Sequence, residues 1–227
     1  MSTVPIDLER LAHQLRNPVT VIRTLAHLVY KRLEGADPNR PLLAAIEQEC
    51  SRLDDLLDLN SHTFELQVID LHNLLATLVG KWKLIAQQQE RLFEAHLTAL
   101  PLVRSNAPAL QEILTNLLDN AIKYTPAGGQ VSLSSFVDHE RQDWCCISIA
   151  DTGEGIADPD LARIYEPYYR GNQTASTTGQ GLGLAIVRDL TGRIGARIEM
   201  CSTPGDGSVF TLYIPVAPSE QPLATGE

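Results

Sequence analysis

Residues 116–124 read Asn-Leu-Leu-Asp-Asn-Ala-Ile-Lys-Tyr, and this segment carries the most information about the fold. On a helix, Asn116, Asn120 and Lys123 fall at positions i, i+4 and i+7, so two carboxamides and an ammonium group share one face. The apolar residues between them can then face a sheet. Mg²⁺ takes few protein oxygens and keeps water and phosphate ligands, so this polar face suits a magnesium and phosphate site. From the spacing alone, a merely solvated helix face stays open as an alternative.

Two glycine-rich turns follow this helix. Asp-Thr-Gly-Glu-Gly at residues 151–155 comes directly after an apolar strand. An aspartate at that strand end can accept from the amino group of a base, and the glycines let the backbone approach a ligand closely. Gly-Gln-Gly-Leu-Gly-Leu at residues 179–184 opens the next helix, whose free N–H groups and dipole can receive polyphosphate. The second turn lacks the preceding strand and the later acidic residue of a dinucleotide-binding fold, so we exclude that class.

The chain around these turns alternates short apolar strands with helices. The pattern predicts strands at 66–71, 92–98, 102–105, 130–137, 144–150, 197–201 and 209–215, and helices at 74–89, 108–124 and 181–194. Interleaved strands and helices of these lengths indicate an α/β sandwich over residues 67–217. The tail, 218–227, has no apolar periodicity, and we expect it to be disordered.

The N-terminal part shows a different pattern. Apolar side chains recur at helical spacing over residues 6–34 and again over 42–64, separated by a run of helix breakers at 35–41. Two tightly joined amphipathic helices bury only one face each, so we expect this hairpin to pair with a copy of itself as a dimeric four-helix bundle. The predicted fold class is α+β, with a dimerisation domain at residues 1–66.

Composition excludes several other classes of protein. The 227 residues are 44% hydrophobic, and 18 basic against 28 acidic residues give a net charge of −10. This indicates a globular protein without the basic cluster that nucleic acid requires. No apolar stretch is long enough to cross a bilayer, so we expect no membrane contact in this chain. The four cysteines lack metal-type spacing, which favours buried thiols and a cytoplasmic location.

Taken in order, the motifs resemble those of the sensor histidine kinases of two-component systems, over residues 6–216. Five segments carry the resemblance: an N box at 116–124, glycine boxes at 151–155 and 179–183, an F box at 164–170 and a last glycine turn at 205–210. The F box has tyrosines where phenylalanines are usual. The resemblance implies an ATP-binding domain of the type shared by gyrase, a heat-shock chaperone, histidine kinases and mismatch-repair ATPases.

The N-terminal hairpin discriminates among the proteins that share this ATP-binding fold. Its segment His-Gln-Leu-Arg-Asn-Pro, residues 13–18, resembles the H box of phosphoacceptor helices. His13 lies off the apolar stripe of Leu11 and Leu15, so its imidazole should project from the bundle. A neutral ring nitrogen there can attack a γ-phosphoryl group. Pro18 removes a helical amide donor, so we expect a bend just beyond His13.

Gln14 departs from the family pattern. Relatives usually place a carboxylate there, which is thought to orient the imidazole and accept its proton, whereas glutamine can hold the ring but cannot act as a base. The autokinase rate is therefore expected to be low. Asn17 matches the position that orients water for dephosphorylating the partner regulator, so the resemblance also implies a phosphatase activity.

The resemblance implies ATP and Mg²⁺ as cofactors. Their expected contacts are Asn116, Asn120, Lys123, Tyr124, Asp151, Gly153, Gly155, Ile156, Gly179, Gly181, Leu182, Gly183 and Leu184. Asn116 and Asn120 are the candidate metal ligands, and Asp151 would select adenine. His13, Gln14 and Asn17 are the expected catalytic residues.

The expected function is ATP-dependent autophosphorylation of His13, followed by transfer to an aspartate in the receiver domain of a response regulator. The expected partners are a second copy of the chain, that regulator, and either a separate sensory protein or a sensor domain outside this sequence. Two alternatives stay open: a pseudokinase or phosphatase module, and a serine-directed kinase of the anti-sigma type. The acid lability of the phosphorylated product separates the serine kinase from the histidine kinase.

Overall fold

The computed structural model describes residues 8–33, 37–59, 64–138, 144–170 and 181–218. The chain divides into two compact units, residues 1–65 and residues 66–227. The first is called the hairpin unit below and the second the sheet unit. Of the predicted tail at 218–227, residues 219–227 lie outside the described residues.

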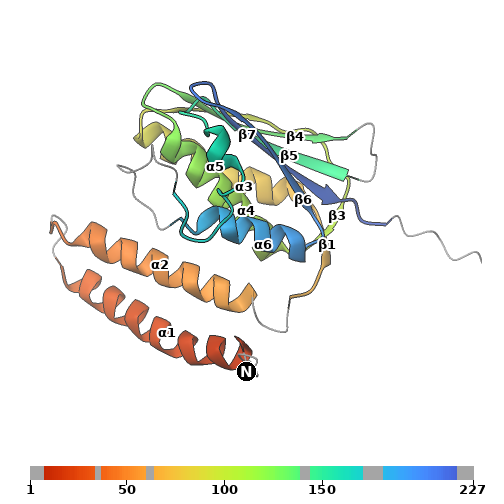
Figure 1. Cartoon of the computed structure of the whole chain (residues 1–227). Helices are drawn as coiled ribbons and strands as arrows, with labels where there is room; N and C mark the ends of the chain where they lie inside the picture. Colours follow the sequence, from red (N-terminus) through yellow and green to blue (C-terminus); the bar gives the residue numbers. More distant parts are fainter. Residues whose placement is uncertain (1–7, 34–36, 60–63, 139–143, 171–180, 219–227) are drawn as a thin grey trace, which may run out of the picture. The chain divides into compact units, whose positions relative to one another are not determined.

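Where it is described, the hairpin unit forms two helices, α1 (Leu8–Arg32) and α2 (Arg40–Leu59), which pack against each other (Figure 1). Val19, Ala26 and Cys50 are buried in this unit. Other apolar side chains of the two helices are exposed: Leu15, Val21, Ile22, Leu25, Leu28, Val29, Leu42, Ile46 and Leu53. They leave an open apolar surface, defined here as the open face of the hairpin.

The described residues of the sheet unit form two sheets and four helices. Its strands are β1 (Gln67–Ile69), β2 (Leu92–His96), β3 (Val103–Ser105), β4 (Gln130–Val137), β5 (Trp144–Asp151), β6 (Arg197–Thr203) and β7 (Gly207–Pro215), and its helices are α3 (Leu71–Gln88), α4 (Ala107–Tyr124), α5 (Asp158–Leu161) and α6 (Gly183–Arg193). The larger sheet has the order β2-β4-β5-β7-β6, and β1 pairs with β3 separately. Only the β2–β4 pair of the large sheet is parallel.

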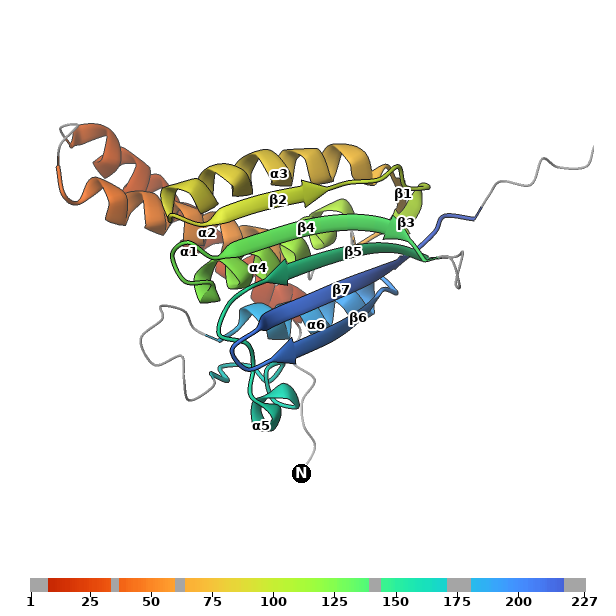
Figure 2. The same ribbon diagram turned by 90° about the horizontal axis from the view of Figure 1, so that it is seen from above.

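Helices α3, α4 and α6 cover one face of the large sheet (Figure 2). Burial alternates along β4, where Val131, Leu133 and Ser135 are buried, because successive side chains point to opposite faces of a strand. The largest fully buried side chains of the described chain are Leu71, Leu75, Leu110, Ile113, Leu114, Leu117, Leu118, Ile122, Leu133, Ile147, Ile149 and Ile194. All of them belong to the sheet unit. The α+β fold class and the α/β sandwich are therefore confirmed.

Side-chain caps set the start of the two long helices in this unit. Asp70 accepts from the backbone N–H of His72 at 2.8 Å, and Asn106 accepts from that of Ala109 at 3.0 Å. Helix α3 begins at Leu71, three residues before the predicted start, because the cap comes earlier than expected. The short helix α5 was not predicted.

The described cysteines are all free thiols. Cys50, Cys145 and Cys146 are buried, whereas Cys201 is exposed. Burial raises the pKa of the Cys145 and Cys146 thiols to about 11. Within the described residues, no helix is both long enough and apolar enough to span a membrane.

Candidate functional site

A cavity opens in the sheet unit beside α4, the end of β5 and the start of α6. It encloses about 820 Å³ of empty space, a volume that includes open solvent at its mouth. The lining residues are Asn120, Ala121, Tyr124, Asp151, Glu154, Gly155, Ile156, Ala157, Asp160, Ile164, Tyr169, Arg170, Leu184, Ser208 and Phe210. Six predicted contact residues are among them: Asn120, Tyr124, Asp151, Gly155, Ile156 and Leu184.

Helix α4 supplies the polar wall of this cavity. Asn120 and Tyr124 line it directly, one helical turn apart. Lys123 does not line it, because its Nζ lies over the Tyr124 ring, 4.9 Å from the ring centroid. Lys123 therefore makes a cation–π contact with a residue that lines the cavity.

Asn116 lies one turn earlier on α4 and is only 5% exposed. Its Nδ2 donates to the backbone carbonyl of Glu112 at 2.9 Å and to Glu112 Oε1 at 2.7 Å. Its Oδ1 faces the first residue of α6, since a Cβ added to Gly183 would lie 3.0 Å from that oxygen. A side chain at position 183 would therefore crowd the amide, and glycine permits the close approach.

Asp151 is the last residue of β5, where the strand delivers its carboxylate to the cavity. The carboxylate Oδ1 accepts from the backbone N–H of Gly153 at 2.9 Å, which fixes the turn that follows. Burial raises the pKa of Asp151 above its usual 3.8, and backbone hydrogen bonds from Gly153 and Ser208 partly offset the shift. Gly153 itself is buried behind this turn.

The start of α6 borders the same cavity. Gly181 has a φ of +71°, and its carbonyl accepts from the Tyr168 N–H at 2.9 Å. Leu182 occupies the N-cap position, and its apolar side chain makes no capping hydrogen bond to the first amides of the helix. Gly179 lies outside the described residues. A helix N-terminus of this kind favours an anionic ligand.

Several lining residues were not predicted as contacts, including Asp160, Tyr169, Arg170 and Phe210. Tyr169 Oη donates to Asp160 Oδ1 at 2.7 Å, and this hydrogen bond raises the pKa of the phenol. The F box and the last glycine turn contain three of the four, so the motif signal was present in the sequence. Asp160 follows no motif, and only the fold brings it to the cavity.

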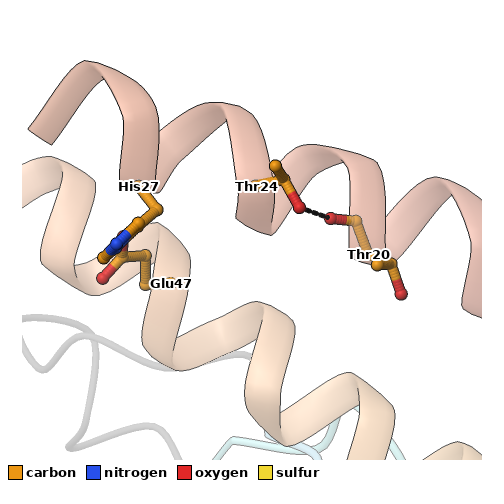
Figure 3. Close-up of polar contacts among 4 residues, drawn as sticks. All are labelled: Thr20, Thr24, His27 and Glu47. Carbon is orange, nitrogen blue, oxygen red and sulfur yellow. Dashed lines mark hydrogen bonds and ion pairs between the residues drawn. The ribbon is translucent and has the colours of Figure 1, made fainter.

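The three predicted catalytic residues lie on α1 of the hairpin unit. His13, Gln14 and Asn17 fall within the helical range Leu8–Arg32, but their side chains are outside the described part of the structure. Figure 3 shows the next histidine along α1, His27, whose Nδ1 lies 2.9 Å from Glu47 Oε1 on α2. His27 therefore links the two helices through Glu47.

The cavity combines two chemistries that a single ligand can use. Apolar side chains such as Ile156, Leu184 and Phe210 line it together with the partly buried carboxylates of Asp151 and Asp160. Carboxamides on α4 and an uncapped helix N-terminus adjoin it. This arrangement suits a ligand with a flat, hydrogen-bonding ring at one end and anionic groups at the other.

Comparisons with known families match both units. Residues 105–218 match the family described as the histidine kinase-, DNA gyrase B-, and HSP90-like ATPase. Residues 8–59 match the His Kinase A (phospho-acceptor) domain.

Curated relatives agree with these two matches. The sensor histidine kinase Hik2 of Thermosynechococcus vestitus is 37% identical over 90% of this chain, and Hik2 of a Synechocystis species is 33% identical over the same share. The sensor histidine kinase ZraS of Escherichia coli is 33% identical over 91% of this chain. The chain spans 57% of the length of each Hik2 protein and 44% of ZraS, so it corresponds to about half of these relatives.

Solved structures show the same fold. Full-length ShkA in complex with AMPPNP has a TM-score of 0.71 and 26% identity, covering 96% of this chain and 47% of that one. The mycobacterial sensor histidine kinase MprB has a TM-score of 0.55 over 68% of this chain and 99% of that one, at 23% identity, which shows the fold alone.

Proposed function

The chain belongs to the two-component sensor histidine kinases, and we propose that it is an ATP-dependent protein-histidine kinase that phosphorylates its own His13. The predicted resemblance to this family is confirmed by the two family matches. The observation that carries the proposed activity is the cavity in which Asn120, Tyr124 and Asp151 meet beside the start of α6. The phosphoacceptor match at residues 8–59 favours histidine over serine as the acceptor.

The nucleotide would enter this cavity base first. The Asp151 carboxylate would accept from the exocyclic amino group of adenine, and Ile156, Leu184 and Phe210 would contact the ring. The phosphates would then extend toward Asn120 and the uncapped N-terminus of α6, whose dipole favours negative charge.

The residues at the phosphate end also fit Mg²⁺. Asn116 and Asn120 offer carboxamide oxygens, the hard donors that this ion accepts, and the Asn116 Oδ1 faces the start of α6. When bound, the ion would offset negative charge on the phosphates. Asn116 and Asn120 would hold it, while the backbone N–H groups of α6 would orient the phosphates.

His13 would act as the nucleophile. A neutral ring nitrogen attacks the γ-phosphorus, the bond from that phosphorus to the bridging oxygen of ADP breaks, and the proton displaced from the imidazole passes to water. Gln14 can orient the ring by a hydrogen bond but cannot take this proton. We therefore expect slow transfer. The acceptor and the nucleotide site belong to different units. The two units must therefore approach each other for each phosphoryl transfer.

A second copy of the chain would complete the hairpin unit. The open face of the hairpin carries Leu15, Ile22, Leu25 and other apolar side chains that are exposed in a single chain. Pairing two such faces as a four-helix bundle would bury them. The domain boundaries that go with this assignment are residues 1–66 for dimerisation and phosphoacceptance and residues 67–217 for ATP binding.

The downstream partner would be the receiver domain of a response regulator, whose aspartate takes the phosphoryl group from His13. Asn17 lies one helical turn beyond His13, and there it would orient water for the reverse, phosphatase reaction. A sensory partner or sensor domain would supply the stimulus. We place the protein in the cytoplasm on the basis of its free, mostly buried thiols.

Incubation with γ-labelled ATP tests the proposal. Acid-labile, base-stable label should appear on the wild type and be lost in His13→Ala. His27→Ala is the matched control, because His27 lies on the same helix, is bonded to Glu47 and should keep full labelling. Label that persists in His13→Ala, or that resists acid, would contradict the assignment of the acceptor.

A further inference from the structure

Glu112 differs from every other charged side chain that the structure describes. It lies on α4, one turn before Asn116, and among the described residues it is the only charged side chain that the fold buries. Carboxylates are rarely buried unless a partner compensates for the lost hydration. Neither the cavity lining nor the predicted site includes Glu112, so its burial needs another explanation.

Glu112 accepts two hydrogen bonds from the side chain of Asn116. The Glu112 Oε1 accepts from Asn116 Nδ2 at 2.7 Å, and the Glu112 backbone carbonyl accepts from the same nitrogen at 2.9 Å. A carboxamide nitrogen carries two hydrogens, so these two acceptors use both. The nitrogen end of the amide is therefore committed to Glu112.

This commitment fixes which way the amide points. If the amide rotated by 180°, its oxygen would face the Glu112 carboxylate and carbonyl, which are both acceptors, and the two hydrogen bonds would be replaced by repulsion. The observed orientation directs Oδ1 to the other side, against Gly183 at the start of α6. Asn116 and Asn120 are one turn apart on the same face, so the orientation also sets whether Asn116 offers an oxygen or a nitrogen beside Asn120.

We propose that Glu112 is a positioning residue for the metal: it locks the Asn116 carboxamide so that Oδ1, and not Nδ2, faces the Mg²⁺ of bound Mg-ATP. The inference rests on the proposed function, and it assigns a role to a residue that touches neither the nucleotide nor the metal. An amide oxygen can ligate Mg²⁺, whereas an amide nitrogen carrying two hydrogens cannot. Outer residues that orient ligands in this way are a general feature of metal sites.

Nucleotide binding measured with and without the metal tests the role. Glu112→Met keeps a similar volume but removes the side-chain acceptor, so that only the backbone carbonyl holds the Asn116 amide and the amide can rotate more easily. Calorimetric titration with ATP should show an affinity about five- to tenfold lower than wild type in the presence of Mg²⁺, the equivalent of one hydrogen bond. In EDTA, the affinity for ATP should equal that of the wild type. The Mg²⁺ concentration needed for half-maximal nucleotide binding should rise by the same factor.

Further variants separate positioning from packing. Glu112→Gln retains an acceptor oxygen and should restore Mg²⁺-dependent binding, whereas Glu112→Asp keeps the charge but withdraws the carboxylate and should behave like Glu112→Met. Asp119→Asn is the matched control, because Asp119 is exposed on the same helix and its change should leave both affinities unaltered. If Glu112→Met does not fold, Glu112→Asp carries the test.

Two results would overturn the inference. One is an unchanged Mg²⁺ dependence in folded Glu112→Met and Glu112→Asp. The other is an equal loss of affinity with and without Mg²⁺, which would make Glu112 a packing residue. Failure of the proposed function looks different: the wild type itself would then bind no ATP under either condition.

Discussion

The hairpin unit and the sheet unit bury their apolar side chains in different ways. In the sheet unit, leucines and isoleucines of α3, α4, β4 and β5 are completely enclosed between the helices and the sheet. Among the described side chains of the hairpin unit, Val19, Ala26 and Cys50 are buried, while nine large apolar side chains of α1 and α2 are exposed.

The difference shows where each unit finds its stability. Burial of apolar surface is the main favourable term in folding, so the sheet unit can be stable as a single copy. The described side chains of the hairpin leave much apolar surface exposed, which the proposed second copy would bury. The proposed site follows the same division, since the nucleotide would bind within one chain and the acceptor would lie in the shared bundle.

The largest contrast should come from truncating one leucine in each unit. Leu118→Ala removes a fully buried side chain of α4 and should lower the free energy of unfolding of the sheet unit by about 2 to 5 kcal/mol. Leu25→Ala, at a side chain 57% exposed in the hairpin, should change that transition by less than about 0.5 kcal/mol. Urea titration followed by tryptophan fluorescence measures the free energy of unfolding of the sheet unit, because Trp82 and Trp144 both belong to that unit. Equal effects would remove the distinction between the two units.

A charge on the open face should have the opposite pattern of effects, weakening the dimer while leaving the sheet unit unchanged. Leu25→Glu places a carboxylate in the proposed dimer interface twice, once from each copy, and should raise the dimer dissociation constant by about a hundredfold. The sheet-unit transition should stay the same. Sedimentation equilibrium measures the mass, with Glu49→Ala on an exposed position of α2 as control. An unchanged mass for Leu25→Glu would show that the open face is not the dimer interface.

The Asp151 carboxylate gives a smaller effect that depends on pH. Because burial raises its folded-state pKa above 3.8, the folded chain takes up a proton at a higher pH than the unfolded chain does. Its contribution to stability therefore increases as the pH falls through the raised pKa, while the proposed acceptance from adenine is lost. Asp151→Asn should lower ATP affinity about tenfold at pH 7 without destabilising the sheet unit.

Calorimetry at two pH values and thermal unfolding check this prediction. In the Asp151→Asn variant, the stability should also lose the part of its pH dependence that comes from the Asp151 carboxylate. Wild-type ATP affinity in that variant would exclude Asp151 from base recognition.

The smallest expected effect is a difference in ATP affinity between variants of two adjacent tyrosines. Tyr169→Phe removes only the hydroxyl that donates to Asp160 in the cavity wall, and ATP affinity should fall about threefold. Tyr168→Phe changes a side chain that is 73% exposed and should leave the affinity unaltered. Equal affinities in the two variants would show that the Asp160 hydrogen bond does not shape the cavity.

Local patterns predicted most elements because they depend on neighbours in the sequence. The periodicity of α1, α2 and α4 and the alternation in β4 and β5 all reflect one buried face per element. The start of α3 was placed too late because Leu71 was assigned to the preceding strand. Leu71, Leu75 and Leu78 in fact form one buried helical stripe that begins after the Asp70 cap.

Residues of the cavity lining were predicted only where they belong to a recognisable sequence motif. Asn120, Tyr124 and Asp151 lie in recognisable segments, whereas Asp160 reaches the cavity through the four-residue helix α5, which is too short to show a period. Glu112 was missed for a different reason. Its burial depends on how α4 packs, and a glutamate is ordinarily expected on a solvated helix face.

Each unit contains at least one buried cysteine, whose modification can report when that unit opens to solvent. Cys50 is enclosed in the hairpin unit, while Cys145 and Cys146 are enclosed in the central strand β5 of the sheet unit. With a pKa of about 11, each of the two sheet thiols has a thiolate fraction about a hundredfold smaller than that of a thiol with the ordinary pKa of 9.0. A thiol-alkylating reagent should therefore modify Cys201 first, and the later labelling of Cys50 and of the β5 pair should time the loosening of the two units separately within one intact chain.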